Sequence, residues 1–483
     1  MYSARRLHPA AILLTIGKYS WNLFPLYTIV LFKYSGSLPF TTIINTALLL
    51  CLFLAVISAG AVVHWRRFIY SIYEEQLIIE YGLFTCKKRY IPKERVQALH
   101  ESEDIIHRLF GLVKLQIDTA GGSGPEVVLR AVTKEEAVQI MKLLSHYKET
   151  GQAAGETVPF SDYTFQLSKR RLFLYAATSG SIGIVFSALA GLYFEIDDFF
   201  HLTFQINDLF GKTASFYAAG LLILALIVWI AGILIVYQKY YGFKVVRQQE
   251  DLIITKGLFE KQKLTIPLGR IQAIKIEENI IRQWLNVASV RLVSAGGKED
   301  ESAELSLICF PLVRKTELSF IFKHFLPGFS IGSSLCSLPR RACKRYIVCV
   351  FLPISIVSLL ALSYIPFATY FVPFMVLASI WLGYRQYKDA GWEINGQQLT
   401  VAFRRLGRIT VLIKRSRIQS LSVSKTVLQE SASLCTVKVY AKSGFSHTAF
   451  PLRDADEGAG VLLRQWYSYG QAAEMHSYAD VNT

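Results

Sequence analysis

One ten-residue pattern occurs three times along the chain and constrains its architecture more than any other feature. The copies span residues 90–99, 265–274 and 412–421, and each contains an arginine, a branched aliphatic residue and a glutamine in succession. The first two copies share flanking landmarks at a constant offset of 175 residues, and the third follows the second at an offset of 147. An internal repeat of this kind predicts an array of related units rather than one compact core.

Each copy of the pattern is preceded by a strongly apolar stretch. Hydrophobic residues make up 52% of the chain and charged residues only 18%, which is typical of integration into a membrane. Six apolar runs are long enough to cross about 30 Å of hydrocarbon, and they lie near residues 11–32, 42–63, 172–194, 214–237, 346–363 and 366–383. They group as three hairpins, so we expect a multi-pass α-helical membrane protein. The last pair is the least secure, since a single long helix there would invert everything that follows it.

The basic residues predict an orientation. Lysine and arginine gather on one set of flanks, fifteen against two, which places both termini and all three soluble units in the cytoplasm. The formal charge of +16 could also indicate a nucleic-acid surface. Because much of the basic excess lies beside the apolar runs, the membrane interpretation is favoured and no nucleic acid is expected.

The soluble units are expected to be β-rich and to end in a helix. In the first unit, short segments with alternating apolar and polar residues are separated by turn residues such as Gly82, Pro92 and Gly111. A helix is predicted over 134–147, opened by a capping box formed by Thr133 and Glu136. The third unit closes in the same way with a helix around 457–466.

These features resemble the bacterial membrane-flanked pleckstrin-homology-like family (bPH2), and in particular its three-repeat members. The resemblance rests on the strand-glycine turns at Gly82 and Gly257, the Ile-Pro and Arg-[Val/Ile]-Gln core, residues 109–113 and the Ala-Gly-Gly turns, and it covers residues 1–467. It implies three β-rich PH-like domains, each of two antiparallel sheets with a C-terminal helix, and no settled activity. The third copy departs from the pattern, since Arg404 replaces the turn glycine and Lys414 replaces the proline.

The boundaries that follow alternate between membrane and soluble segments. Transmembrane hairpins are expected at 1–66, 171–239 and 345–385, and PH-like domains at 67–148, 240–326 and, in diverged form, 386–468. Linkers are expected at 149–170 and 327–344, and a polar tail at 469–483.

The repeated arginine and glutamine admit two interpretations. In the first, they hydrogen-bond strand or loop carbonyls and hold the junction between the two sheets. In the second, they and nearby lysines form a basic surface that meets anionic headgroups or a partner. The candidate lipid or partner surface consists of Arg95, Gln97, Arg270, Gln272, Arg417, Gln419, Lys87, Lys88, Lys261 and Lys263.

No chemistry of the catalytic or metal-binding kind is predicted. The seven cysteines are scattered without Cys-x-x-Cys spacing, and the nine histidines form no metal-ligand pattern. We therefore expect no catalytic residues, no metal and no cofactor.

The expected function is a non-enzymatic binding or scaffolding assembly at the inner membrane surface, in the setting of envelope integrity or tolerance of membrane-active compounds. The alternatives are an exporter or permeability factor for an amphiphilic peptide or small molecule, and an enzyme with an unrecognised site. Membrane lipids are expected partners. A second copy of this chain or a smaller single-domain PH-like membrane protein is also expected, and the resemblance implies the smaller protein.

Overall fold

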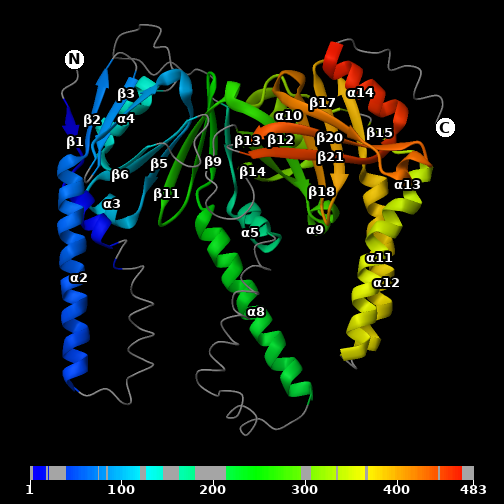
Figure 1. Cartoon of the computed structure of the whole chain (residues 1–483), viewed down its shortest axis with the longest axis horizontal. Helices are drawn as coiled ribbons and strands as arrows, with labels where there is room; N and C mark the ends of the chain where they lie inside the picture. The colour runs from blue at the N-terminus through cyan, green and yellow to red at the C-terminus, as the bar shows by residue number, and fades with distance from the viewer. Residues whose placement is uncertain are drawn as a thin grey trace. The chain divides into compact units, whose positions relative to one another are not determined.

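The computed structural model describes residues 4–17, 20, 40–73, 76–82, 85–119, 127–144, 163–179, 214–294, 306–332, 335–364, 368–443 and 446–469. Its strands form four antiparallel sheets. Contacts divide the chain into two compact units, which are shown in Figure 1. Unit 1 holds residues 1–160, 248–255 and 259–267, and unit 2 holds residues 161–247, 256–258 and 268–483.

The expected multi-pass α-helical class is wrong. The described residues are β-rich, and among them one helical segment, Arg340–Leu360, is long and apolar enough to cross a membrane, while Leu226–Lys239 is a shorter apolar helix. Hydropathy gave the wrong class because it scores the mean apolar character of a run of residues and not the helix that the run forms. The predicted run 366–383 forms part of a helix that contains Pro373 and several polar or aromatic residues, and most of the runs 11–32 and 172–194 lies outside the described residues.

Unit 1 contains the first repeat and two strands of the second. A four-stranded sheet has the order β1-β2-β3-β4 (Arg5–Arg6, Ile69–Tyr73, Gln76–Tyr81, Lys87–Pro92). A second group of neighbouring strands has the order β7-β6-β5-β11-β10 (Val127–Thr133, Leu112–Thr119, Val96–Glu103, Lys261–Pro267, Asp251–Lys256). Its helices are α2 (Phe40–Arg67), α3 (Ile105–Leu109) and α4 (Lys134–Leu144).

The core of unit 1 lies between the faces of these strands. Alternate residues of the strands point inward, as the period of two in a half-buried strand requires, and Leu77, Ile79, Leu115, Ile117 and Leu129 are buried there. The predicted capping box is confirmed: the Glu136 amide donates to Thr133 Oγ1, and the Thr133 amide donates to the Glu136 carboxylate.

Unit 2 contains the rest of the second repeat and the third. Its seven-stranded sheet has the order β14-β13-β12-β18-β17-β16-β15 (Ser306–Arg314, Val287–Ser294, Ile271–Glu278, Arg408–Lys414, Gln398–Arg404, Gly391–Asn395, Cys336–Ser337). A three-stranded sheet has the order β19-β20-β21 (Ile418–Ser424, Leu434–Ser443, Ser446–Asp456). Two further strands, β8 (Thr164–Gln166) and β9 (Lys244–Gln248), pair with each other.

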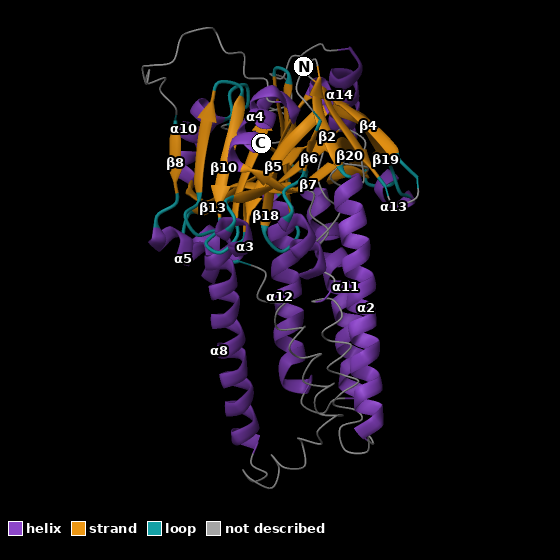
Figure 2. Cartoon of the chain, turned by 90° about the vertical axis from the view of Figure 1, so that its left-hand side faces the viewer, coloured by secondary structure: helices purple, strands orange, loops and turns teal. Residues whose placement is uncertain are grey.

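The helices of unit 2 are of two kinds. Long helices are α8 (Ala214–Lys239), α11 (Arg340–Tyr364) and α12 (Ala368–Asp389), and they leave the strand-rich part on one side (Figure 2). Shorter helices are α5 (Lys169–Ala177), α9 (Ile280–Trp284), α10 (Lys315–Phe325), α13 (Val427–Glu430) and α14 (Glu457–Tyr469). In the last domain α14 covers the sheets and buries Trp466, whose indole donates to Gly396 O.

Candidate functional site

The repeated ten-residue pattern forms the same local structure three times. In each copy a strand ends, one 3₁₀ turn follows, and the next strand starts at the residue after the arginine: β4-η1-β5, β11-η2-β12 and β18-η3-β19, with η1 Lys93–Arg95, η2 Leu268–Arg270 and η3 Arg415–Arg417. Pro92 has φ −73° and ψ 147° before the first turn, which suits proline because its ring fixes φ near this value. Lys414 has φ −79° and ψ 142°, so the third copy keeps the conformation without proline.

The strand after each of the first two turns pairs with a strand of the next repeat. β5 pairs with β11, with Leu99 opposite Thr265, and β12 pairs with β18, with Ile274 opposite Leu412. Under the offsets of 175 and 147 residues these two pairs are equivalent positions, so both junctions use one register. A register shift of one residue would turn every side chain to the other face of the sheet. The shared register is therefore a specific property of the repeat.

The arginines and glutamines lie at the turns, in different environments. Arg95 is exposed, while Arg270 and Arg417 are half-buried, and Arg417 donates to Gly269 O. Gln272 is buried and its amide donates to Arg270 O at 3.0 Å. Gln419 is exposed, and Gln97 belongs to β5 but its side chain lies outside the described set. Two of these side chains thus bind backbone carbonyls at a junction between strands.

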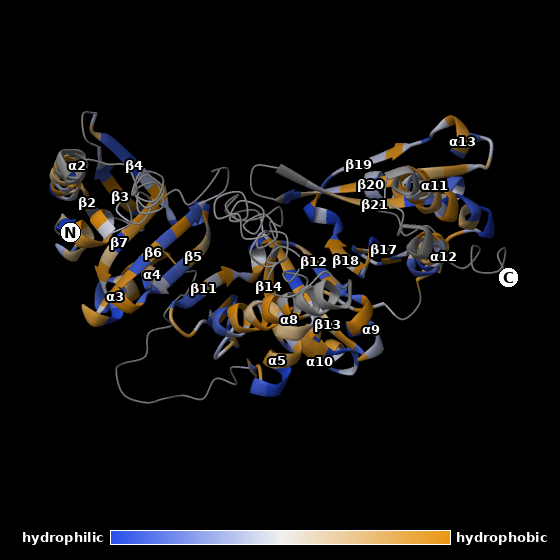
Figure 3. Cartoon of the chain, turned by 90° about the horizontal axis from the view of Figure 1, so that it is seen from below, coloured by the Kyte–Doolittle hydropathy of each residue, from blue (hydrophilic) through white to orange (hydrophobic). Residues whose placement is uncertain are grey.

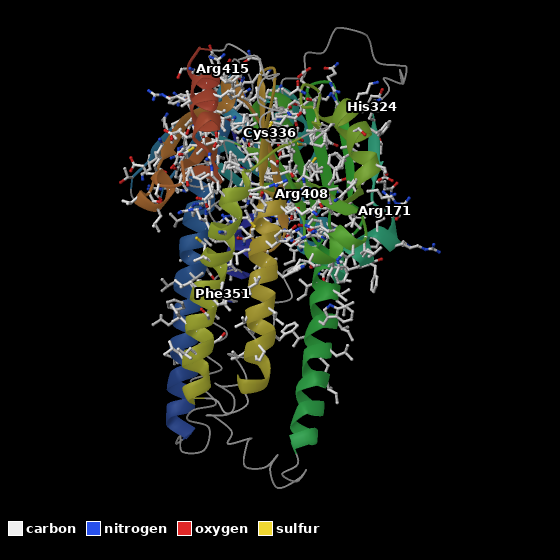
Figure 4. All side chains as sticks on the ribbon, turned by 90° about the vertical axis from the view of Figure 1, so that its right-hand side faces the viewer. Arg171, His324, Cys336, Phe351, Arg408 and Arg415 are labelled. Atoms are coloured by element: carbon white, nitrogen blue, oxygen red, sulfur yellow. The ribbon has the colours of Figure 1, made fainter. Side chains whose placement is uncertain are left out.

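The four candidate lysines lie at the other end of the same strands. Lys87 and Lys88 begin β4, and Lys261 and Lys263 lie at the start of β11, so about 13–20 Å of strand separates them from the turns at a rise of about 3.3 Å per residue. In unit 2, Figure 4 shows the equivalent ends of β18: Arg408 lies nearer to the long helices and Arg415 lies at the far end. In each of the first two repeats, the candidate lysines and the triplet turn therefore lie at opposite ends of one strand.

Carboxylates meet the lysine group at the junction in unit 1. Lys263 Nζ lies 3.8 Å from a Glu101 carboxylate oxygen, and Lys261 is opposite Glu103 in the pairing of β11 with β5. Burial raises the pKa of Glu101, and Lys263 opposes that shift. In unit 2, Arg408 is likewise opposite Glu278. Sequence reasoning missed these acids, although Glu103 and Glu278 occur at the same distance after the Arg-[Val/Ile]-Gln triplet; the position of Glu101 is Ile276 in the second repeat.

β4 corresponds to β11 and β18, and β19 corresponds to β5 and β12, but neither β4 nor β19 pairs with a strand of another repeat among the described residues. β4 ends the order of its sheet, and β19 ends the order of another. Tyr90 of β4 is 57% exposed, whereas the equivalent residues Thr265 and Leu412 are 8% and 1% exposed. Lys88 at this edge contacts Glu80 of its own sheet at 2.7 Å, which raises the pKa of Lys88.

The departure of the third copy at Arg404 has a structural reason. Arg404 is buried, its Nε donates to Asp389 at the end of α12, and its guanidinium also donates to Gln283 Oε1 and Leu406 O. The turn between β17 and β18 instead places Gly407 where a Cβ would lie 2.7 Å from Glu278 O. This turn is therefore built for close contact with the preceding repeat.

Comparison with known proteins agrees with this architecture. The family model described as bacterial PH domain (bPH_2) matches three times, over residues 12–148, 198–320 and 345–470. The chain is also 33% identical to the UPF0699 transmembrane protein YdbT of Bacillus subtilis (strain 168), over 98% of this chain and 99% of that protein. Three PH-like repeats and similarity along the whole length to a transmembrane protein make this a membrane protein with PH-like domains. The chain belongs to the bacterial PH domain family, as a three-repeat member of the YdbT type.

Proposed function

We propose that the protein is a non-catalytic scaffold at the inner membrane surface that binds another PH-like protein by extending its first sheet at β4. Cytoplasmic placement of the domains and of both termini, expected from the basic flanks, is part of this proposal. So is the setting, which is envelope integrity or tolerance of membrane-active compounds. The exporter alternative stays a prediction.

The repeated junction carries this proposal. Two of the three first-sheet edges, β11 and β18, pair with the strand that follows the triplet in the repeat before them, in one register. β4 has the same position in its own repeat, and it ends the order of its sheet among the described residues. Adding a strand to an exposed sheet edge is a common way to bind a partner, because main-chain hydrogen bonds give affinity and side chains give specificity.

The charge of β4 indicates what its partner carries. Lys88 is equivalent to Lys263, which contacts Glu101. A strand that binds β4 in the same register therefore needs a carboxylate at the position that Glu101 has in β5, since opposite charges stabilise cross-strand pairs and like charges destabilise them.

A second copy of this chain fits that requirement poorly. Its only described strand of this kind with an open edge is β19, which has Val423 at the position of Glu101 and is followed by Lys425 at the position of Glu103 and Glu278. The partner that fits is a PH-like domain of another protein with an acidic strand after its triplet. Lysine on an edge strand also discourages unwanted pairing, which is consistent with selection against self-association.

Site-specific photocrosslinking in native membranes tests the proposal. We would replace Tyr90 with p-benzoylphenylalanine and use the same replacement at Phe320 as the matched control, because these aromatic side chains are 57% and 56% exposed. We expect an adduct at position 90 whose linked peptide comes from the strand after the triplet of a different PH-like protein. Lys88→Glu should lower its yield severalfold, because it places a negative charge opposite the expected carboxylate, and Lys323→Glu should not.

Two outcomes would overturn the proposal. One is a yield at position 90 no greater than at position 320. The other is an adduct formed only with a second copy of this chain at β19, which would show self-association instead of binding to another PH-like protein.

A further inference from the structure

Each repeat contains a short helix with a reversed distribution of polar and apolar side chains. The helices are α3, α9 and α13, and in each the residue that points into the domain is polar: His107, Arg282 and Gln429, which are about 4–5% exposed. These three residues are equivalent under the offsets of 175 and 147 residues. A surface helix of a soluble domain normally buries its apolar stripe and exposes its polar face. The reversal therefore recurs in every repeat and needs an explanation.

The buried polar residues are held by specific hydrogen bonds. His107 Nε2 contacts Arg130 O at 2.8 Å. Arg282 donates to Ser289 Oγ, and Gln429 donates to Thr436 Oγ1, and these two acceptors are again equivalent positions. Because each of these polar side chains makes a hydrogen bond inside its domain, the helix is held with its other side chains facing outward.

The outward side chains are large and apolar. Leu109 is 81% exposed on α3, Trp284 is 80% exposed on α9, and Val427 is 82% exposed on α13. Their apolar neighbours are also exposed, namely Ile105, Ile106, Phe110, Ile281, Leu285 and Leu428. Figure 3, which looks along the molecule from below, shows the hydrophobic colouring of α3 and α13. Contiguous exposed apolar groups of this kind mark sites of interaction with a protein or a membrane.

Contacts in unit 2 place α9 beside the domain end of α12 and α13 beside the domain end of α11. Arg282 Nε donates to Thr178, directly after α5, and the amide of Gln283 on α9 faces Arg385 near the end of α12. Arg345 in the first turns of α11 donates to Leu428 O of α13 at 2.8 Å. Figure 1 shows α9 at the lower border of its domain, on the side from which α8 extends.

In unit 1, Arg130 connects α3 to the first apolar run. Arg130, whose carbonyl contacts His107 Nε2, donates from its guanidinium to Thr15 Oγ1 at 3.1 Å. Thr15 belongs to the helical residues 10–17 of the first apolar run. In each unit, therefore, the short helices are tied to segments that begin or end an apolar run.

We infer that α3, α9 and α13 insert their apolar side chains into the interfacial region of the lipid bilayer and hold each PH-like domain against it. These exposed side chains, which we call the tips, are expected to contact lipid because each short helix lies beside a long helix or an apolar run. Positive charge on the same or neighbouring elements comes from Arg108, Lys169 and Arg170. Basic residues beside apolar ones favour anionic lipid surfaces, where an apolar face enters about 5–10 Å into the headgroup and acyl boundary. A tryptophan such as Trp284 is typical of that depth.

Depth-dependent quenching in vesicles tests this inference on the full-length protein. A small fluorescent amino acid would replace Leu109, Trp284 or Val427, one at a time, with Phe320 as the control because it is an exposed aromatic residue on α10. The vesicles would contain phosphatidylethanolamine and phosphatidylglycerol, with lipids brominated near the top of the acyl chains. We expect quenching at each of the three positions about threefold stronger than at position 320, as an apolar face at interfacial depth requires.

The three positions provide independent tests if one variant fails to fold. Equal quenching at the tips and at position 320 would overturn the inference, and so would probes at the tips that remain as accessible to aqueous iodide as the control. The vesicles contain no other protein. If the exposed side chains of α3, α9 and α13 bind a protein partner instead of lipid, they should therefore remain unquenched by the brominated lipids. This experiment does not depend on β4, and its result is separate from that of the crosslinking experiment.

Discussion

Arg404 gives the sharpest test of how the last two repeats are held together. Its side chain is fully buried, with 0% exposure, and the Asp389 side chain with which it pairs is 12% exposed. The guanidinium also donates to Gln283 on α9, so one residue joins α12, the turn after β17 and the preceding repeat. Arg404→Met removes the charge but keeps much of the volume, and it leaves Asp389 buried without its partner.

The expected loss of stability is large. Breaking a buried ion pair by removing one partner costs about 3–5 kcal/mol, because the remaining charge is uncompensated. For a cooperative unit of about 150–250 residues, each kcal/mol lowers the melting temperature by about 2–4 °C, so we expect a fall of roughly 6–20 °C. The measurement is thermal unfolding of the detergent-solubilised full chain, with hydrogen exchange in β12 and β18 as a local readout.

Two further variants separate the ion pair from other effects. Arg404→Met combined with Asp389→Leu removes both charges, and should recover most of the loss because an apolar pair of similar size can replace a buried ion pair. Arg405→Met changes the exposed neighbour, and should alter the free energy of unfolding by no more than about 0.5 kcal/mol. If Arg404→Met behaves like Arg405→Met, or if the double variant is no more stable than the single one, the reasoning about this junction is refuted.

Two other predictions concern packing and pH. A Cβ on Gly383 of α12 would lie 2.7 Å from the Ile347 Cα of α11, so Gly383→Leu should lower the melting temperature by separating the helices, while Gly60→Leu, where a Cβ meets nothing within 4 Å, should change it little. The contact between Asp104 and His107 raises the pKa of His107 above its usual 6.5. The same contact lowers the pKa of Asp104 below its usual 3.8. The pair therefore adds stability between those values, and the His107 contribution is lost as pH rises through its folded pKa. Asp104→Asn should lower the melting temperature of unit 1 between those pH values and should remove the pair's part of its decline above and below them. A pH profile that matches the unchanged protein would contradict the assignment.

Local structure followed from the sequence where local chemistry decides it. The capping box at Thr133 and Glu136, the short strands of the first unit and the closing helix of the third repeat are all set by residues close together in the chain. Pairing of β5 with β11 joins residues more than 150 positions apart, and its register depends on acids and lysines whose meeting no local pattern reveals. The reversed short helices were missed for a related reason. A polar residue between apolar ones looks ordinary until its burial is known, as His107 shows.

The divergence of the third repeat agrees with the pairing of β19, which ends the order of its sheet among the described residues. β5 and β12 each pair with a strand of the next repeat, whereas β19 pairs with β20 of its own repeat. The backbone of the triplet turn is needed within every domain, and the third copy keeps its arginine and glutamine there, with Lys414 in the extended conformation of Pro92. The acids that follow the triplet are needed only where a next repeat pairs, and in the third copy Lys425 stands at the position of Glu103 and Glu278. The residues that form the junction between repeats can therefore change while the residues that form the fold of each domain are kept.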